Sequence, residues 1–248
     1  MKQSPISVIL GFAILFAVYH FPEFFNAFWI AAVFKIGFLF VAYIIARAQG
    51  LRDLGGYGLN FHEGWSGNLM KGLLFGLAFY ILFIAFCIML GYERIAAPVN
   101  PTELIKKLPL ILLMTLFPSV AEDILTRGYL FAFLKRKVGS RGFALISASV
   151  YVLNHIWRYT DGPAVLCYLF ILGLALAYAV WHTRSLWLAF GIHWATNIVY
   201  ESSVPFLKTG TLSESSSNWL LAGIYFLLLC FLLLTTKLVR YSKHRSYR

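Results

Sequence analysis

The sequence predicts an all-α membrane protein with about eight transmembrane helices around a polar intramembrane cavity. Its composition is 60% hydrophobic and only 12% charged, a balance far from that of soluble domains. Apolar stretches of about 20 residues, the length that spans a bilayer as a helix, recur along the chain. The connections between them are too short to fold separately. We therefore expect residues 1–248 to form a single transmembrane domain.

The spans follow one another with short loops. The first, an apolar run that ends near Phe21, resembles a secretory signal peptide, but the sequence after His20 offers no small-residue cleavage site, and we expect it to remain. The later spans are predicted near residues 26–46, 68–92, 108–134, 142–157, 163–182, 186–203 and 218–236. The longest connection, residues 47–67, contains a glycine-rich turn.

The basic residues predict the orientation. An even number of spans places both termini on one side, and most lysines and arginines fall on that side. The exceptions outside the spans are Arg94, Lys106, Lys107, Arg158 and Lys208. Cytoplasmic loops are enriched in Lys and Arg, so both termini are predicted to be cytoplasmic in a cell membrane. The net charge of +11 is then a topology signal rather than evidence of a nucleic-acid partner, and the basic tail at 237–248 is predicted to contact anionic lipid.

The fourth span contains the most unusual residues, two carboxylates and a guanidinium in an apolar segment: Glu122, Asp123 and Arg127. A charge at the middle of a membrane helix costs roughly 2.5–3.5 kcal/mol, which makes such residues candidates for function. Asp123 and Arg127 are four residues apart and can pair on one helix face, whereas Glu122 points about 100° away. Glu122 is therefore the carboxylate predicted to be free for chemistry. The alternative is a buried ion pair that only joins helices.

Two other spans carry polar side chains at helical spacing. Tyr151 and His155 lie at the end of the fifth span, where His155 could also be an interfacial residue. His193 and Asn197 project from one face near the middle of the seventh, where they could also form a helix–helix hydrogen bond. In the sixth span, Gly173 and Ala177 indicate close helix packing. No role is assigned to Lys35, and the cysteines suggest neither disulfides nor a thiolate metal site.

These motifs resemble those of the CPBP group of intramembrane proteases, which includes the type II CAAX prenyl endopeptidases and the bacterial Abi proteins. The family's Glu-Glu-xxx-Arg motif is similar to Glu122-Asp123-xxx-Arg127, its Phe-xxx-His motif to Tyr151-xxx-His155, and its His-xxx-Asn motif to His193-xxx-Asn197. The resemblance covers a core of about residues 108–200. The chain departs from these motifs at two positions. Asp123 stands in place of the second Glu and retains the charge, and Tyr151 stands in place of Phe and retains the aromatic ring.

The resemblance implies an intramembrane endopeptidase without a cofactor that acts on a membrane-associated or exported protein or peptide. Glu122 would be the general base on a water held with His155, and His193 and Asn197 would stabilise the oxyanion. Asp123, Arg127 and Tyr151 would support this set. Helix depths counted from the flanking basic residues predict a cavity open laterally or toward the outer face.

Three alternatives stay open at this point. One is a zinc site at Glu122, His155 and His193, although no His-Glu-x-x-His motif occurs. Another is a proton-coupled transporter, which would usually show repeated, broken helices. The third is a catalytically silent immunity or binding protein on the same scaffold. The substrate could be a prenylated peptide, a bacteriocin leader or the membrane anchor of an exported protein.

Overall fold

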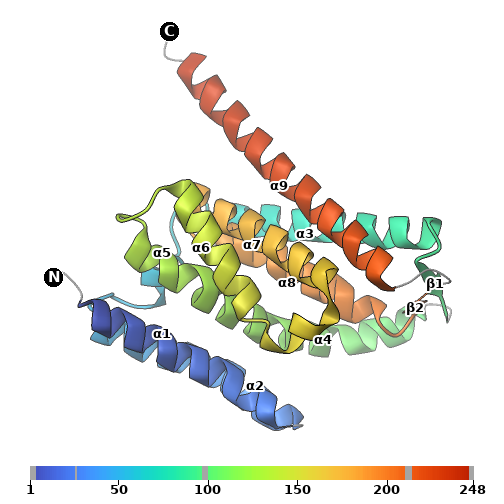
Figure 1. The fold of residues 1–248 in the computed structure, drawn as a ribbon, viewed down its shortest axis with the longest axis horizontal. Helices are drawn as coiled ribbons and strands as arrows, with labels where there is room; N and C mark the ends of the chain where they lie inside the picture. The colour runs from blue at the N-terminus through green and yellow to red at the C-terminus, as the bar shows by residue number, and fades with distance from the viewer. Residues whose placement is uncertain (1–3, 26, 97–99, 210–213, 246–248) are drawn as a thin grey trace.

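The computed structural model describes residues 4–25, 27–96, 100–209 and 214–245, and its helical content confirms the all-α class. The helices run alongside one another as a bundle (Figure 1). In order they are α1 (Pro5–His20), α2 (Phe28–Ala48), α3 (Trp65–Met89), α4 (Pro101–Asp123), α5 (Tyr129–Leu134), α6 (Ser140–Leu153), α7 (Pro163–Thr183), α8 (Trp187–Ser203) and α9 (Glu214–Arg245). Three short 3-10 segments join them: η1 (Phe21–Phe24), η2 (Leu54–Tyr57) and η4 (Ile156–Asp161).

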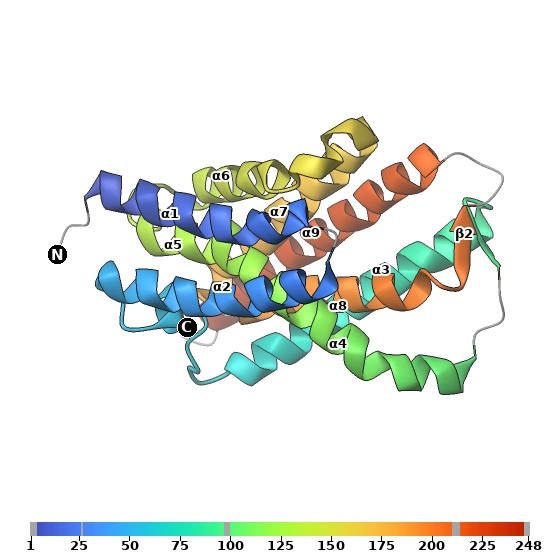
Figure 2. The ribbon, with the colours of Figure 1, turned by 90° about the horizontal axis from the view of Figure 1, so that it is seen from below.

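Among the described residues, six segments are long and apolar enough to cross a membrane, which establishes a multi-pass membrane protein. They are Pro5–Phe24, Phe28–Ala48, Trp65–Met89, Pro101–Leu134, Pro163–Thr183 and Ser216–Thr235. The other two predicted spans correspond to α6 and α8, which have only 14 and 17 residues. Both lie within the same bundle (Figure 2). Their crossing of the bilayer stays a prediction.

The fifth span was predicted to continue to residue 157, and this was wrong. Helix α6 ends at Leu153, and His155 adopts a non-helical conformation with φ −95° and ψ 52°. At this end of the helix the ring of His155 takes the place of a backbone donor, since its Nδ1 donates to the carbonyl of Tyr151 at 2.7 Å. In a continuing helix that carbonyl would accept the backbone N–H of residue 155, which instead bonds to Val152.

A second irregularity lies in the span that carries the acidic pair. Directly after Asp123 the helix widens into a π-helical segment, η3 (Ile124–Gly128), before α5 resumes the α-helical pattern. Short π segments inside α-helices are rare and frequently occur at functional sites. The sequence analysis treated residues 108–134 as one regular helix and did not predict this turn.

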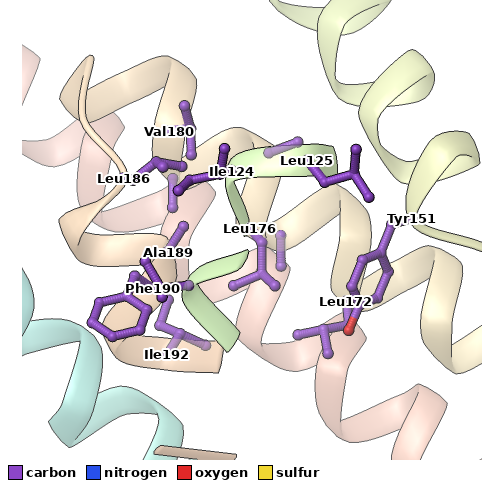
Figure 3. Packing of buried hydrophobic residues seen from close by; sticks show 14 of the residues in the cluster. Ile124, Leu125, Tyr151, Leu172, Leu176, Val180, Leu186, Ala189, Phe190 and Ile192 are labelled. Carbon is purple, nitrogen blue, oxygen red and sulfur yellow. The ribbon is translucent and has the colours of Figure 1, made fainter. Parts of the chain in front are cut away.

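Hydrophobic side chains from η3, α7 and α8 pack together in the core, including Ile124, Leu176 and Ile192 (Figure 3). Two glycines let helices approach closely there. A Cβ at Gly173 would lie 2.9 Å from Cα of Ala148, so α7 packs directly on α6, in line with the small-residue face expected at Gly173. A Cβ at Gly191 would lie 2.9 Å from the backbone nitrogen of Leu73, which brings α8 against α3.

A short antiparallel ribbon, unpredicted by the sequence, joins two loops at one end of the bundle. Strand β1 (Glu93–Ile95) follows α3, and strand β2 (Leu207–Thr209) follows α8. Helix α1 begins toward the opposite end, as Figures 1 and 2 show. The side chains from residue 236 onward, and with them the predicted lipid contact of the tail, lie outside the described residues.

Candidate active site

The carboxylate of Glu122 lies between two imidazole rings that come from different parts of the chain. Nε2 of His155, after α6, lies 3.6 Å from Oε1, and Nε2 of His193, on α8, lies 3.5 Å from Oε2. Glu122 and His193 are buried, with 7% and 2% of their surface exposed. The structure therefore brings together the three side chains that the sequence placed on three separate spans.

Both rings are oriented through their other nitrogen. Nδ1 of His155 donates to the carbonyl oxygen of Tyr151 at 2.7 Å. Nδ1 of His193 donates to Oδ1 of Asp123 at 3.1 Å. A carbonyl or carboxylate oxygen can only accept, so each Nδ1 carries a hydrogen. This leaves both Nε2 atoms directed at Glu122.

Asp123 and Arg127 form the ion pair that their four-residue spacing predicted, and both side chains are completely buried. The guanidinium of Arg127 lies over the ring of Tyr151, 4.5 Å from its centroid. That ring also contacts both histidines edge-on, with centroid separations of 4.7 Å to His155 and 6.0 Å to His193. Arg127 thus supports the site through both a charge contact and an aromatic contact.

Asn197 lies on the wall of the same cavity, one turn beyond His193. Its Nδ2 donates to Oγ of Ser119 on α4 at 2.9 Å. Both donor groups expected to serve an oxyanion, on His193 and Asn197, therefore border the same space as Glu122. The serine was not singled out in the sequence analysis.

The sequence analysis also missed Asn154. This buried residue donates its side-chain amide to Oε1 of Glu122 at 2.9 Å and so makes a closer contact to the carboxylate than either histidine. Two signals could have found it. It directly precedes His155, and it is an amide at the end of an apolar helix, where a buried polar group needs a partner.

The cavity has a volume of about 890 Å³ and extends from Glu122 to the ribbon. Its lining includes Glu93, Arg94 and Leu207 on the two strands, Arg158 in η4, and residues of α3, α4, α7, α8 and α9. Aromatic side chains contribute to the lining beside the polar groups, among them Tyr80, Phe83, Tyr168 and Tyr225. The space is large enough for a short peptide segment and contains both apolar and hydrogen-bonding surface.

In the part of the chain that the structure describes, no group of three or more His, Cys, Asp or Glu side chains has the arrangement of a metal site. The two Nε2 atoms instead face separate oxygens of Glu122. The zinc alternative therefore needs an experiment of its own.

Comparison with known families now adds to this geometry. Residues 104–199 match the sequence model of the family described as type II CAAX prenyl endopeptidase Rce1-like. The chain carries an Rce1-like endopeptidase domain. The matched segment contains every motif residue from Glu122 to Asn197, and it identifies the chain as a membrane-embedded protease. A search of the curated proteins finds no match. The Rce1-like segment excludes α1, α2, α3 and α9, although α3 and α9 line the cavity.

Proposed function

We propose that the chain hydrolyses a peptide bond of a membrane-associated or exported protein, with Glu122 as the general base. One observation carries this proposal: the Glu122 carboxylate is buried between Nε2 of His155 and Nε2 of His193 and lines a cavity of about 890 Å³. Peptide hydrolysis requires a base beside a water molecule and donors beside the carbonyl oxygen. The side chains around Glu122 offer both.

The nucleophilic water would lie between Glu122 and His155. With Nδ1–H bonded to the Tyr151 carbonyl, a neutral His155 ring carries a lone pair at Nε2. A water molecule can donate one hydrogen to that nitrogen and the other to Glu122. Its own lone pair is then free to attack the substrate carbonyl carbon. As the C–O bond forms, Glu122 takes the proton, and it returns this proton to the amide nitrogen when the C–N bond breaks.

The negative oxygen of the tetrahedral intermediate would be stabilised by Nε2–H of His193 and the amide of Asn197. Donation from Nε2 requires a His193 ring with hydrogens on both nitrogens, because Nδ1–H is already bonded to Asp123. Asp123 and Glu122 are the two negative charges that face this ring. Asn197 would exchange its bond to Ser119 for one to the oxyanion.

The substrate would reach the site from the end of the bundle that carries the ribbon. The cavity extends toward Glu93, Arg94 and Arg158. In the charge pattern these arginines belong to the side opposite the termini, which is the outer side if both termini are cytoplasmic. We therefore propose exported or membrane-anchored substrates and residence in the cell membrane. The basic tail would hold anionic lipid on the inner side.

A comparison of protein termini tests this function and identifies the substrate at the same time. Membrane and secreted proteins would be analysed by mass spectrometry from cells with the wild-type chain and from cells with Glu122→Gln at the same level of folded protein. We expect at least one protein whose terminus is shortened only by the wild-type chain. Identical termini in both samples would contradict the proposal and favour a silent binding protein or a transporter.

A further inference from the structure

A second cluster of buried charge lies beside the candidate active site, on helices outside the Rce1-like segment. Nδ1 of His20, the last residue of α1, lies 2.6 Å from Oε2 of Glu23, and Nζ of Lys35 on α2 lies 3.6 Å from Oε1 of Glu23. His20 and Lys35 are buried, with 4% and 9% of their surface exposed. Nε2 of His20 lies 3.0 Å from Oδ1 of Asn154, the residue that contacts Glu122.

The hydrogen bonds that run from Glu122 through Asn154 to His20 each have a direction, which follows from the atoms that can donate. Glu122 as a carboxylate only accepts, so the nitrogen of the Asn154 amide faces it and the amide oxygen faces His20. That oxygen also only accepts. Nε2 of His20 must therefore carry a hydrogen.

Nδ1 of His20 faces the carboxylate of Glu23, and the groups around Glu23 favour the ionised form of this carboxylate. Glu23 accepts a hydrogen bond from Nε1 of Trp157 at 2.9 Å, and the Lys35 ammonium lies beside it. An ionised Glu23 can only accept from Nδ1 of His20. Both ring nitrogens then donate, and His20 is an imidazolium ion.

The positive charge of His20 has a counterion beside it. Oε2 of Glu23 lies 2.6 Å from Nδ1 of His20, and the other oxygen of Glu23 faces Lys35. A buried charge is costly unless it is paired, and Glu23 supplies this pairing. Lys35 itself is held by the carbonyl of Tyr19 at 3.0 Å and lies over the ring of that residue.

We infer that His20, held by Glu23 and Lys35, is a positioning residue for Glu122. It determines which way the Asn154 amide turns, and thereby presents a donor rather than an acceptor to Oε1 of Glu122. With the amide reversed, its oxygen would face a carboxylate oxygen, and Glu122 would turn away from the two histidines. Helices α1 and α2 would then be part of the catalytic apparatus. This inference rests on the proposed role of Glu122 as the base.

A purely structural role for His20 can be separated from a positioning role, because the same helix pair has a second buried polar contact. Near the other end of α1 and α2, Nε2 of Gln49 donates to the carbonyl of Ser7 at 2.8 Å and to the hydroxyl of Tyr129 at 2.7 Å. Gln49 fastens the start of α1 to the end of α2 and to α5, at the end of the helix pair opposite to His20. Gln49→Leu is therefore the matched control.

The kinetic test uses the full-length chain and a peptide that spans a cleavage site found by the terminus comparison. His20→Gln should lower kcat by roughly tenfold to a hundredfold, the range typical of a misplaced catalytic group, and leave KM unchanged because His20 does not line the cavity. Gln49→Leu should lower the unfolding temperature but leave kcat of the folded protein unchanged. Equal kcat in His20→Gln and wild type, or an equal loss in both variants, would overturn the positioning role.

A second measurement needs no substrate. In the full-length chain with ¹⁵N-labelled histidine, His20 is assigned by comparison with His20→Gln, and its ring should show hydrogens on both nitrogens at neutral pH. Glu23→Gln and Lys35→Met should change these signals. A ring with one protonated nitrogen would overturn the inference whether or not the chain cleaves peptides. Identical substrate termini in cells with the wild-type chain and with Glu122→Gln would instead contradict the proposed function. The NMR measurement would still show whether His20 carries hydrogens on both nitrogens.

Discussion

Oδ1 of Asp123 contacts both Nδ1 of His193, at 3.1 Å, and the guanidinium of Arg127. One carboxylate oxygen therefore links the buried ion pair to a histidine of the candidate active site. The adjacent acid, Glu122, faces the two Nε2 atoms and the cavity. Neighbouring acids in the sequence thus have different partners, and substitutions at the two positions should have different effects.

Glu122→Gln should abolish cleavage while the protein remains folded. Glutamine retains the size of the side chain but is a far weaker base, so it cannot take a proton from water. The measurement is cleavage of an identified substrate together with the unfolding temperature, which should stay near the wild-type value. Cleavage at the wild-type rate would exclude Glu122 as the base.

Asp123→Asn should reduce both stability and turnover. The sequence analysis assigned Asp123 a supporting role through its pairing with Arg127, and loss of this pairing should lower stability. The structure adds the contact to His193, which an asparagine could misorient. Leaving Arg127 buried without its partner should cost about 3–5 kcal/mol of unfolding free energy. Denaturation and the kcat of the surviving folded fraction measure the two effects. A destabilised variant with wild-type kcat would confine Asp123 to a structural role.

Removal of metal should leave cleavage unchanged, because the proposed mechanism uses only side chains and water. The experiment treats purified protein with a chelator and measures its activity and its zinc content. The zinc alternative predicts a different pattern: activity lost with the metal and restored by added zinc, with the metal content of a Glu122→Ala variant reduced. That pattern would reassign Glu122, His155 and His193 as ligands.

Labelling of single cysteines should determine the orientation. In a variant without Cys87, Cys167 and Cys230, new cysteines would replace Thr160 in η4 and Ser140 at the start of α6, two exposed positions toward opposite ends of α6. An impermeant thiol reagent should label Thr160→Cys in intact cells and Ser140→Cys only after permeabilisation. The reverse pattern would place the cavity mouth and the substrate on the cytoplasmic side.

The spacing of residues along the sequence predicted the positions of most helices and several contacts within them. Runs of apolar residues placed most helices within a few residues of their observed ends, because a bilayer demands continuous apolar helices of similar length. The four-residue separation of Asp123 and Arg127 predicted their ion pair, since residues at that distance share a helix face. For the same reason His193 and Asn197 were expected on one surface, and both line the cavity.

Contacts between distant parts of the chain could not be predicted in this way. His20 and Asn154 are 134 residues apart, and no periodicity connects them. His20 was named in the sequence analysis only because the residues after it offer no signal-peptide cleavage site. The end of α6 was also missed, because it depends on a side-chain ring that takes the place of a backbone donor at the Tyr151 carbonyl. Each of these features depends on the position of a side chain in the folded protein, which the spacing of residues along the sequence does not give.

The ribbon of β1 and β2 holds part of the cavity lining in place through bonds that do not depend on side chains. Its strands pair Glu93 with Thr209 and Ile95 with Leu207, and the pairing continues with a bond from Ala96 to the carbonyl of Phe206 at 2.8 Å. These are main-chain bonds, which most amino acids can make. The residues that the ribbon presents to the cavity can therefore change, and with them the charge and shape of that surface, while the pairing of the two strands stays the same.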